Sequence, residues 1–438
     1  MNSPNSNRIA LFKSPLGDLG VIYFKQAIEM LKQNKFISMI AIAGTALAIM
    51  MIMVIIVTDA IKTVSIAPEI NRDRTFYIKR YTKKYKDESK KGMWQSTPDY
   101  DLYKNYLSDF KTPQYATAVD FGWNGDQLMV KKMDVNERFL AKVRRTDAVY
   151  WKVMSFTFTA GKPFTEQDFA SGIPNAVISE SLAKKVFGKN EALGKTVEIG
   201  FHPYTVVGIV KDVSQTFLYG YGEAYIPYTS MTGYEKRGGY DILLVLKDKK
   251  DLAALTEEIK AAQRKFNSVD PEWNITFHGP YTQRQTQMNE TQDMRPDEKT
   301  AYRKLIFIFA VLLLIPAVNL SGFSMSQIKR RTEEIGVRKA FGAKKYIILI
   351  QVLFENFITT LIGGCIGLIL SYFVVAGLKE WLLDIDADSS IPVHALVSYP
   401  VLAGVFAACF LLNLLSAGIP AYRASKANIV DSINKKNN

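Results

Sequence analysis

The chain has 438 residues, 48% of them hydrophobic and 22% charged, and its mean hydropathy is close to zero. This balance excludes both a wholly soluble protein and one wholly embedded in lipid, so we expect membrane helices joined to a large water-exposed part. The formal net charge of +13 argues against a nucleic-acid-binding protein, because the basic residues cluster beside apolar segments, where membrane topology and anionic lipid account for them.

The N-terminal residues 1–35 are predicted to be a cytoplasmic tail, because basic side chains outnumber acidic ones there. Lys25, Glu29 and Lys32 lie away from an apolar helical face, which predicts an amphipathic helix on the inner membrane surface. That apolar face consists of Leu19, Ile22, Tyr23, Ala27 and Met30. Residues 36–58 carry no charge and are long enough to cross ~30 Å of hydrocarbon, so they form the predicted first transmembrane helix.

Residues 59–302 are predicted to form a large mixed α/β domain of two lobes on the outer side of the membrane, inserted between the first and second transmembrane helices. Its clearest local signal is a strand followed by a helix that Ser179 caps and Gly188 ends. Stretches rich in β-branched residues at 196–199 and 204–210 predict two more strands, separated by a turn. Two less patterned flanking stretches are assigned to the second lobe: 59–150 and 233–280.

No catalytic or metal-binding pattern stands out in this outer domain. The stretch from Gly188 to Thr196 approaches a phosphate-binding loop, but it has five residues between its glycines, and the helix precedes the strand instead of following it. Each of His202, His278 and His394 lacks a His or Cys partner at ligand spacing, so we expect isolated surface histidines and no zinc site. We therefore expect no enzymatic activity, no metal and no directly bound cofactor.

The aromatic stretch Phe217–Tyr228 allows two interpretations. It can form an exposed contact surface for a lipid-like cargo or a partner, or it can be a buried strand-turn-strand whose rings fill a core. The second interpretation is favoured.

Residues 303–325 are the predicted second transmembrane helix, in which Pro316 allows a kink. The predicted fourth transmembrane helix, residues 397–419, ends at Pro420. In the loop 379–396, between the third and fourth helices, acidic residues outnumber basic ones, so the loop should lie on the outer side of the membrane. The basic tail 420–438 should be cytoplasmic.

The predicted third transmembrane helix, 346–378, carries a stripe of small residues, Gly363, Gly367 and Ser371, at four-residue spacing. Such a stripe allows close helix contact, either with a second subunit or within one subunit. We expect no ionisable group at the mid-membrane positions of these helices, and therefore no polar substrate channel through the bilayer.

Residues 326–345 form a short charged segment between the second and third transmembrane helices. Seven basic side chains against two acidic ones place this segment on the cytoplasmic side. Thr332 can cap a helix here and Gly342 can end it. The pattern is typical of a helix that docks on another protein; the alternative is a solvated loop that only sets topology. The small apolar face of this helix would consist of Val337, Ala340 and Phe341.

The stretch Glu334–Ala343, EIGVRKAFGA, resembles the coupling helix of the MacB/FtsX class of ABC transporter permeases. Residues 161–214 resemble the periplasmic core domain of that class, and the C-terminal GIPAYRASKANIVDSI resembles its tail, although Ile429 stands where the class usually has proline. In this class the coupling helix seats in a groove of a cytoplasmic ATPase. The residues that the resemblance implies for this contact are Glu333, Glu334, Ile335, Gly336, Val337, Arg338, Lys339, Ala340, Phe341 and Gly342.

The resemblance implies an α-helical membrane protein with four transmembrane helices, located in the bacterial cell (inner) membrane. It implies a permease subunit without its own ATPase, so that ATP acts through partner ATPase subunits. It also implies pairing with a second permease copy or a paralogue. Contacts with membrane lipid and with a periplasmic adaptor or cargo protein are further expectations. ATP-driven motion would pass from the coupling helix through the second transmembrane helix to the outer domain, a mechanism called mechanotransmission.

Three outputs occur within this class: export or efflux of a drug, peptide or lipid-like substrate, lipoprotein release, and control of cell-wall hydrolases. The large outer domain favours export. An alternative from a different class is a membrane-anchored sensor or scaffold that uses the charged segment only as an anchor. A tethered ectoenzyme is disfavoured, because the outer domain shows no cluster of acid, base and nucleophile.

Overall fold

The computed structural model describes most of the chain between Phe24 and Leu378 and a few positions after it. The residues described are 24–25, 27–29, 31–33, 35–61, 63–120, 127–133, 135–188, 191–236, 239–330, 337, 341, 345–378, 404–405, 407, 411, 418 and 422. The chain divides into a helical unit, which includes residues up to Val57 and from Lys304 onward, and an α/β unit, which contains Thr58–Arg303.

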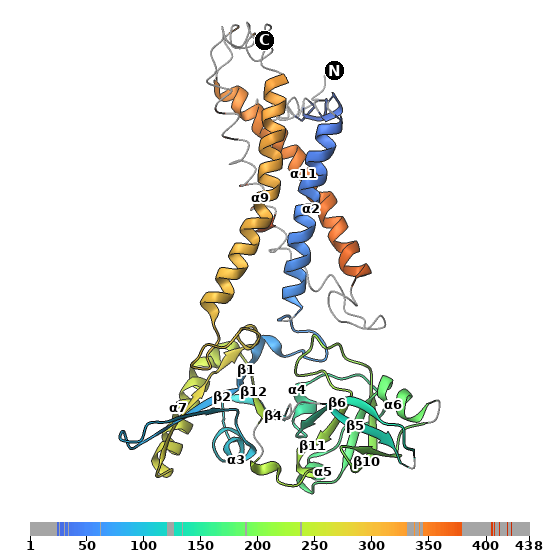
Figure 1. Cartoon of the computed structure of the whole chain (residues 1–438), viewed down its shortest axis with the longest axis vertical. Helices are drawn as coiled ribbons and strands as arrows, with labels where there is room; N and C mark the ends of the chain where they lie inside the picture. The colour runs from blue at the N-terminus through green and yellow to red at the C-terminus, as the bar shows by residue number, and fades with distance from the viewer. Residues whose placement is uncertain are drawn as a thin grey trace, which may run out of the picture. The chain divides into compact units, whose positions relative to one another are not determined.

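Three long helices dominate the helical unit (Figure 1): α2, Lys35–Ala60; α9, Glu298–Arg330; and α11, Lys345–Gly377. Within the described residues, two segments are long and apolar enough to cross a membrane, namely Lys35–Ala60 and Leu349–Gly377. They overlap the predicted first and third transmembrane helices. The predicted second helix lies inside α9, which stays one helix through Pro316. The predicted fourth helix lies mostly outside the described residues.

The three helices pack through small apolar clusters. Ile49, Ile52 and Met53 of α2 are buried against Leu312 of α9. Before α2, the described residues of the segment 24–33 are helical, with Ala27 fully buried and with Lys25, Glu29 and Lys32 exposed. At these positions the structure agrees with the predicted amphipathic helix.

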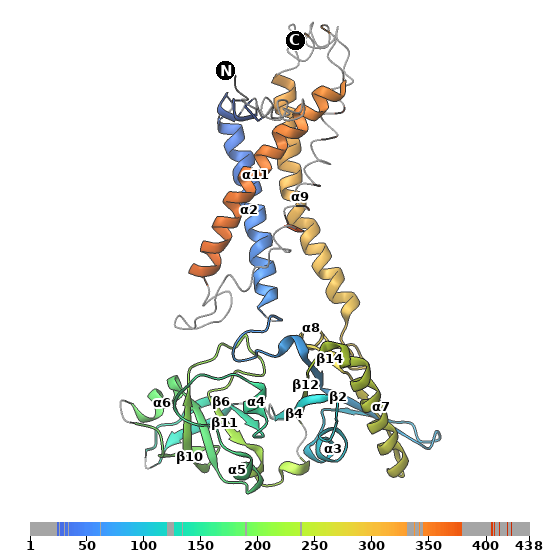
Figure 2. The same ribbon diagram turned by 180° about the vertical axis from the view of Figure 1, so that it is seen from behind.

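The α/β unit contains an eleven-stranded sheet and a three-stranded sheet (Figures 1 and 2). Six strands of the large sheet form a closed ring in the order β11-β8-β10-β9-β5-β6, because β6 also pairs in parallel with β11. The ring strands are β5, Gln127–Lys132; β6, Phe139–Thr146; β8, Asn175–Ser179; β9, Thr196–Ile199; β10, His202–Val210; and β11, Ala224–Pro227.

An apolar core fills this ring, because alternate residues of each strand point inward. In β10 the buried Tyr204 and Val206 alternate with the exposed Pro203 and Thr205. Other strands contribute Val130, Val143, Ile178, Val197 and Ile226 to the same core. The helix α6, Glu180–Phe187, covers it with Leu182, Val186 and Phe187.

The remaining strands of the large sheet continue from β6 in the order β4-β12-β1-β14, and β7 pairs with β10. The small sheet has the order β13-β2-β3, and α7, Leu252–Val269, packs against β13 with a buried stripe at helical spacing. That stripe is Leu255, Ile259, Ala262 and Phe266.

The strands outside the ring are β1, Thr75–Ile78; β2, Arg80–Tyr85; β3, Met93–Ser96; β4, Pro113–Asp120; β7, Phe158–Gly161; β12, Tyr240–Leu246; β13, Trp273–His278; and β14, Tyr281–Thr282. The short helices are α3, Tyr100–Leu102; α4, Tyr150–Val153; α5, Glu166–Ala170; and α8, Gln283–Thr286.

The ring corrects the predicted division into lobes. The sequence assigned all of 59–150 to the second lobe, but β5 and β6 belong to the ring with residues 175–227. Pairing between β6 and β11 joins segments about 80 residues apart, as in Arg144 with Tyr225, and no local pattern carries that information.

Local predictions around α6 are confirmed. The Ser179 hydroxyl accepts a hydrogen bond from the Leu182 N–H at 3.2 Å, and Gly188 ends the helix with φ 68°. β9 has the predicted bounds, and β10 begins two residues before the predicted Tyr204.

Candidate functional site

Only two residues of the predicted coupling segment lie within the described part of the chain. Val337 is helical and Phe341 lies in a turn, and the Phe341 N–H donates to the Val337 carbonyl oxygen at 3.1 Å, the spacing of one helical turn. The Val337 side chain is 48% exposed and that of Phe341 is 89% exposed, the highest value for a large apolar side chain among the described residues. The other predicted contact residues, 333–336, 338–340 and 342, lie outside the described residues.

The helices on either side of this segment share a buried hydrogen bond. The Ser324 hydroxyl of α9 donates to the Asn356 side-chain oxygen of α11 at 2.8 Å, and both side chains are at most 3% exposed. Asn356 also donates to the Val352 carbonyl within α11 at 2.7 Å. In an apolar environment such a bond has little competition from water, so it fixes one helix relative to the other.

α11 also carries a buried ionisable residue next to Asn356 in the sequence, which corrects the expectation of none. Glu355 of α11 is 4% exposed and accepts a hydrogen bond from Gln351 at 3.2 Å. Gly363 is the midpoint of the apolar segment Leu349–Gly377, so Glu355 lies eight residues away, about 12 Å along the helix axis. It is therefore within the ~15 Å half-thickness of the hydrocarbon core. Buried ionisable groups at this depth mark functional or structural polar sites.

The small-residue stripe of α11 packs against α2 of the same chain. A Cβ atom at Gly363 would lie 2.9 Å from Thr45 Cβ, and one at Gly367 would lie 2.5 Å from the Ala46 carbonyl oxygen. Ser371 is 7% exposed and donates to the Leu368 carbonyl at 2.7 Å. Both glycines thus serve packing within one subunit, one of the two alternatives that the sequence left open.

In the α/β unit, a buried ion pair holds the chain that follows α2. Arg72 Nε lies 2.6 Å from Glu69 Oε2, and both side chains are at most 2% exposed. Arg72 Nη1 donates to the Ile61 carbonyl at 2.6 Å, directly after α2 ends. Glu69 Oε1 accepts from the N–H groups of Tyr219 and Gly220 at 2.9 and 2.8 Å. Ile61, the residue after α2, is therefore connected through two buried charges to the loop before β11.

A second set of contacts holds the start of α9. The Arg284 side chain of α8 pairs with Asp59, the penultimate residue of α2. Its neighbour Gln285 donates to the Glu298 carboxylate, in the first turn of α9, at 2.6 Å. The Asp297 N–H donates to the Asn289 carbonyl at 2.8 Å. The short helix α8 thus contacts the end of α2 and the beginning of α9.

Burial shifts the pKa of two acids of the α/β unit, Asp147 and Asp241. Burial raises the pKa of Asp147 to about 6, although its carboxylate accepts from the Thr117 hydroxyl at 2.6 Å and the Tyr150 N–H at 2.9 Å. Burial likewise raises the pKa of Asp241 to about 6, against Lys79 at 4.0 Å and the Tyr219 hydroxyl at 3.0 Å.

The remaining predictions for the α/β unit have mixed outcomes. His278 is not a surface residue: it is 6% exposed, and its Nε2 lies 2.6 Å from the Thr82 hydroxyl of the paired strand β2. Burial lowers its pKa. His202 is exposed, and His394 lies outside the described residues. Within the described residues, no group of three His, Cys, Asp or Glu could hold a metal ion.

The aromatic stretch Phe217–Tyr228 is buried, which confirms that part of the favoured interpretation. Phe217, Tyr219, Tyr225 and Tyr228 are at most 2% exposed, and only β11 is a strand there. These rings belong to the core and offer no exposed surface for cargo.

Two family models match the chain in sequence order. Residues 38–262 match the MacB-like periplasmic core domain, and residues 306–429 match the FtsX-like permease C-terminal domain. The chain is 26% identical over 290 residues to the ABC transporter permease YknZ of Bacillus subtilis, an alignment that covers 65% of this chain and 67% of that protein. Among solved structures, the extracellular domain of the ABC-type transporter YknZ from Gram-positive bacteria is similar over 46% of this chain and 100% of that chain, with 21% identity and a TM-score of 0.34.

Two further relatives carry an ATP-binding part in their names. The macrolide export ATP-binding/permease protein MacB of Chromobacterium violaceum is 25% identical over 332 residues, which cover 74% of this chain and 46% of that protein. The pyoverdine export ATP-binding/permease protein PvdT of Pseudomonas entomophila is 26% identical over 318 residues, which cover 70% and 45%. The chain thus spans about half the length of these two relatives.

Sequence reasoning missed the buried polar contacts of this site. The sequence shows only that apolar segments contain the polar residues Ser324, Glu355 and Asn356. It does not show which of these residues contact one another. Arg72 and Glu69 stand three residues apart, a spacing typical of exposed helical pairs, so their burial could not be read from it.

Proposed function

Because this chain belongs to the MacB/FtsX-type family of ABC transporter permeases, we propose that it transmits ATP-driven motion from a separate cytoplasmic ATPase to its α/β unit. The family indicates a multi-pass protein of the bacterial cell membrane with a periplasmic domain, and in general an ATPase partner and a dimeric assembly. The α/β unit corresponds to that domain, since the match at 38–262 includes most of it.

The observation that carries this proposal is the position of the coupling segment between two helices that share a buried hydrogen bond. A partner that grips the exposed face around Val337 and Phe341 moves α9 and α11 together, because Ser324 and Asn356 join them. α9 is continuous from Arg330 to Glu298, where Gln285 binds its first turn. A displacement along α9 therefore acts directly on the α/β unit.

The cargo is proposed to be a peptide, drug or lipid-like substrate that is exported and handled on the outer side. The names of two relatives, macrolide export and pyoverdine export proteins, support export over lipoprotein release or hydrolase control. The buried Glu355 does not change this proposal, because its carboxylate accepts a hydrogen bond from Gln351 of the same helix, as expected for a packed polar contact.

The proposal includes its partners and topology. Both termini and the coupling segment are cytoplasmic, the chain pairs with a second copy or a paralogue, and ATP binds only to the ATPase subunits. The chain itself carries out no chemistry and holds no cofactor.

Affinity purification of the full chain from its native membrane tests this proposal. A stoichiometric ATPase should co-purify, and Phe341→Ala should lower its amount by about tenfold or more, because an exposed aromatic anchor contributes about 2 kcal/mol or more to such an interface. Glu334→Lys and Arg338→Glu should have the same effect. Phe373→Ala is the matched control, since Phe373 is an exposed phenylalanine of α11, 66% exposed, away from the coupling segment.

A wild-type complex without any ATPase would contradict the proposal and support a membrane-anchored scaffold. Equal loss in the Phe341 and Phe373 variants would mean that the coupling segment is not the docking surface.

A further inference from the structure

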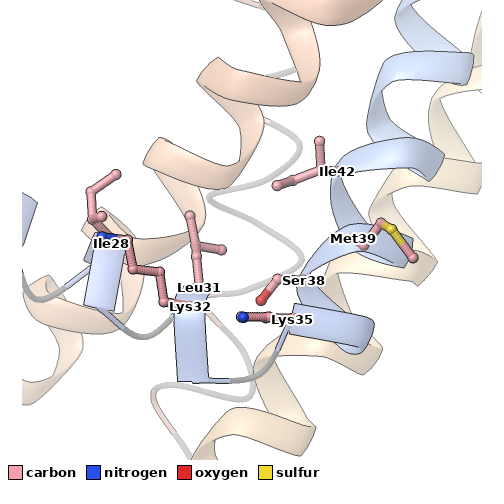
Figure 3. Close-up of a pocket in the computed structure, with 7 residues that line it drawn as sticks. All are labelled: Ile28, Leu31, Lys32, Lys35, Ser38, Met39 and Ile42. Carbon is pink, nitrogen blue, oxygen red and sulfur yellow. The ribbon is translucent and has the colours of Figure 1, made fainter.

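A cavity of about 340 Å³ lies where the helical segment 24–33 meets the first turns of α2 (Figure 3). Three lining residues come from the segment before α2 and four from α2 itself. They are Ile28, Leu31 and Lys32, and Lys35, Ser38, Met39 and Ile42.

The lining combines an apolar surface with two positive charges. Ile28, Leu31, Met39 and Ile42 provide the apolar surface, whereas Lys32 and Lys35 are both exposed. No acidic residue is among the residues that line the cavity. Lys35 is also the last charged residue before Asp59, so this end of α2 is where a membrane-spanning helix passes from water into lipid.

Ser38 supplies an independent observation. Its side chain is 3% exposed, and its hydroxyl has no hydrogen-bond partner in the described structure. A buried hydroxyl without a partner is unfavourable, and it can rotate to bind an acceptor when one arrives. In Figure 3 this hydroxyl and the Lys35 ammonium group lie on the side of α2 that faces Leu31 and Lys32.

We propose that this cavity binds one anionic phospholipid. The phosphate is held by the ammonium groups of Lys32 and Lys35 and accepts a hydrogen bond from the Ser38 hydroxyl. The acyl chains lie along the apolar side of the cavity, over Met39 and Ile42. This apolar surface extends to Phe36 outside the cavity, and the side chains of Phe36 and Met39 are 71% and 61% exposed. A zwitterionic lipid fits less well, because the lining offers no carboxylate for its cationic group.

Binding is measured on the full chain in detergent with dioctanoyl phosphatidylglycerol, by lipid-dependent thermal stabilisation and by native mass spectrometry. We expect saturable binding of one lipid. Lys32→Gln and Lys35→Gln should each raise the apparent Kd about fivefold, the effect of removing one basic side chain near an anionic lipid, and the double variant about 25-fold. Lys25→Gln is the matched control, because Lys25 is exposed on the same helical segment but does not line the cavity.

Ser38→Ala separates a ligand contact from a defect of the fold. Without lipid the variant should be as stable as the wild type or more stable, because it loses a buried unpaired hydroxyl. With saturating phosphatidylglycerol its Tm should rise less than that of the wild type, since the lipid stabilises the state that it binds.

Three results would overturn the proposal. The first is equal weakening by Lys25→Gln, which would indicate a general surface potential. The second is equal stabilisation by dioctanoyl phosphatidylcholine, and the third is full stabilisation by inorganic phosphate alone. None of these measurements requires an ATPase, so the result is independent of the proposed transport function.

Discussion

At the scale of single residues, the α/β unit contains two carboxyl groups that folding removes from water. Asp147 is 5% exposed and Asp241 is 6% exposed. Hydrogen bonds from Thr117 and Tyr150 to Asp147, and from Tyr219 to Asp241, only partly replace hydration. Each acid therefore binds its proton more tightly in the folded domain than in the unfolded chain.

This difference predicts that stability falls as pH rises. A carboxyl with a pKa of 3.8 when exposed and about 6 when folded stabilises the fold fully below pH 3.8, and this contribution is lost as pH rises through 6. The loss is up to about 3 kcal/mol for each group. Thermal unfolding of the full chain between pH 4 and 7 measures it, and Asp241→Asn should reduce the slope because the amide does not ionise. Glu191→Gln, at an exposed position, is the control; equal slopes in wild type and Asp241→Asn would contradict the prediction.

The sequence did not predict which polar residues are buried. His278 was expected at the surface because it has no ligand partner nearby in the sequence, yet strand pairing between β13 and β2 brings it beside Thr82, 196 positions away. Glu355 was overlooked because a single acid changes little in the hydropathy of an apolar segment. Both environments depend on contacts between distant elements.

At the scale of elements, the close approach of α11 to α2 depends on two glycines. Gly363 and Gly367 leave room for the Thr45 side chain and for the backbone at Ile42 and Ala46. Any side chain at these positions would separate the helices, so the stripe fixes the distance between them.

Gly367→Ala tests this contact. The new Cβ would lie 2.5 Å from the Ala46 carbonyl oxygen, so the helices must move apart, at a cost of about 1–3 kcal/mol. Gly377→Ala is the matched control in the same helix, because its Cβ would meet no atom within 4 Å. Thermal stability in detergent is the measurement, and equal Tm values for the two variants would show that the contact does not hold α2 against α11.

A double-mutant cycle tests the hydrogen bond between α9 and α11. Ser324→Ala and Asn356→Ala should show a coupling energy of about 0.6 kcal/mol, the average for hydrogen bonds between membrane helices, and at most about 1.7 kcal/mol. Thr359→Val serves as the control, because the Thr359 hydroxyl donates to the Glu355 carbonyl within α11 and has no other hydrogen bond among the described residues, so it should not couple to Ser324. Additive effects of Ser324→Ala and Asn356→Ala would contradict a shared bond.

Elements with local signals were predictable, whereas their pairing was not. Ser179 and Gly188 set the limits of α6 through backbone chemistry that acts over a few residues, and β9 follows from its β-branched residues. The position of β5 and β6 next to these elements follows from sheet closure. For the coupling segment, the described Val337 and Phe341 agree with a helical turn, and the role of its ten residues stays a prediction.

At the scale of the whole molecule, Arg72 holds the chain that directly follows α2 within the α/β unit. It binds Glu69, Ile61 and the Thr216 carbonyl at once, and its guanidinium lies 4.7 Å from the centre of the Phe217 ring. Only the planar fork of arginine can serve several acceptors in fixed directions.

Arg72→Lys keeps the positive charge but should weaken the transmission of ATP-driven motion to the α/β unit. We expect the ATPase to bind as in the wild type, whereas the ATP-dependent change in protease sensitivity of the α/β unit should decrease, with a stability loss of about 1–3 kcal/mol. Lys249→Gln is the control, since its ion pair with Asp73 is at least half exposed and contributes little. An unchanged protease response in Arg72→Lys would mean that the joint does not carry the motion.

The closed ring of β11, β8, β10, β9, β5 and β6 has a consequence for local opening. Each of these strands is paired on both sides, so one strand can leave only if two ladders break together. The amides of the ring should accordingly exchange their protons with solvent only when the whole barrel opens, and they should be the slowest to do so in the α/β unit. A body that opens only as a whole transfers an applied force with little loss to internal deformation.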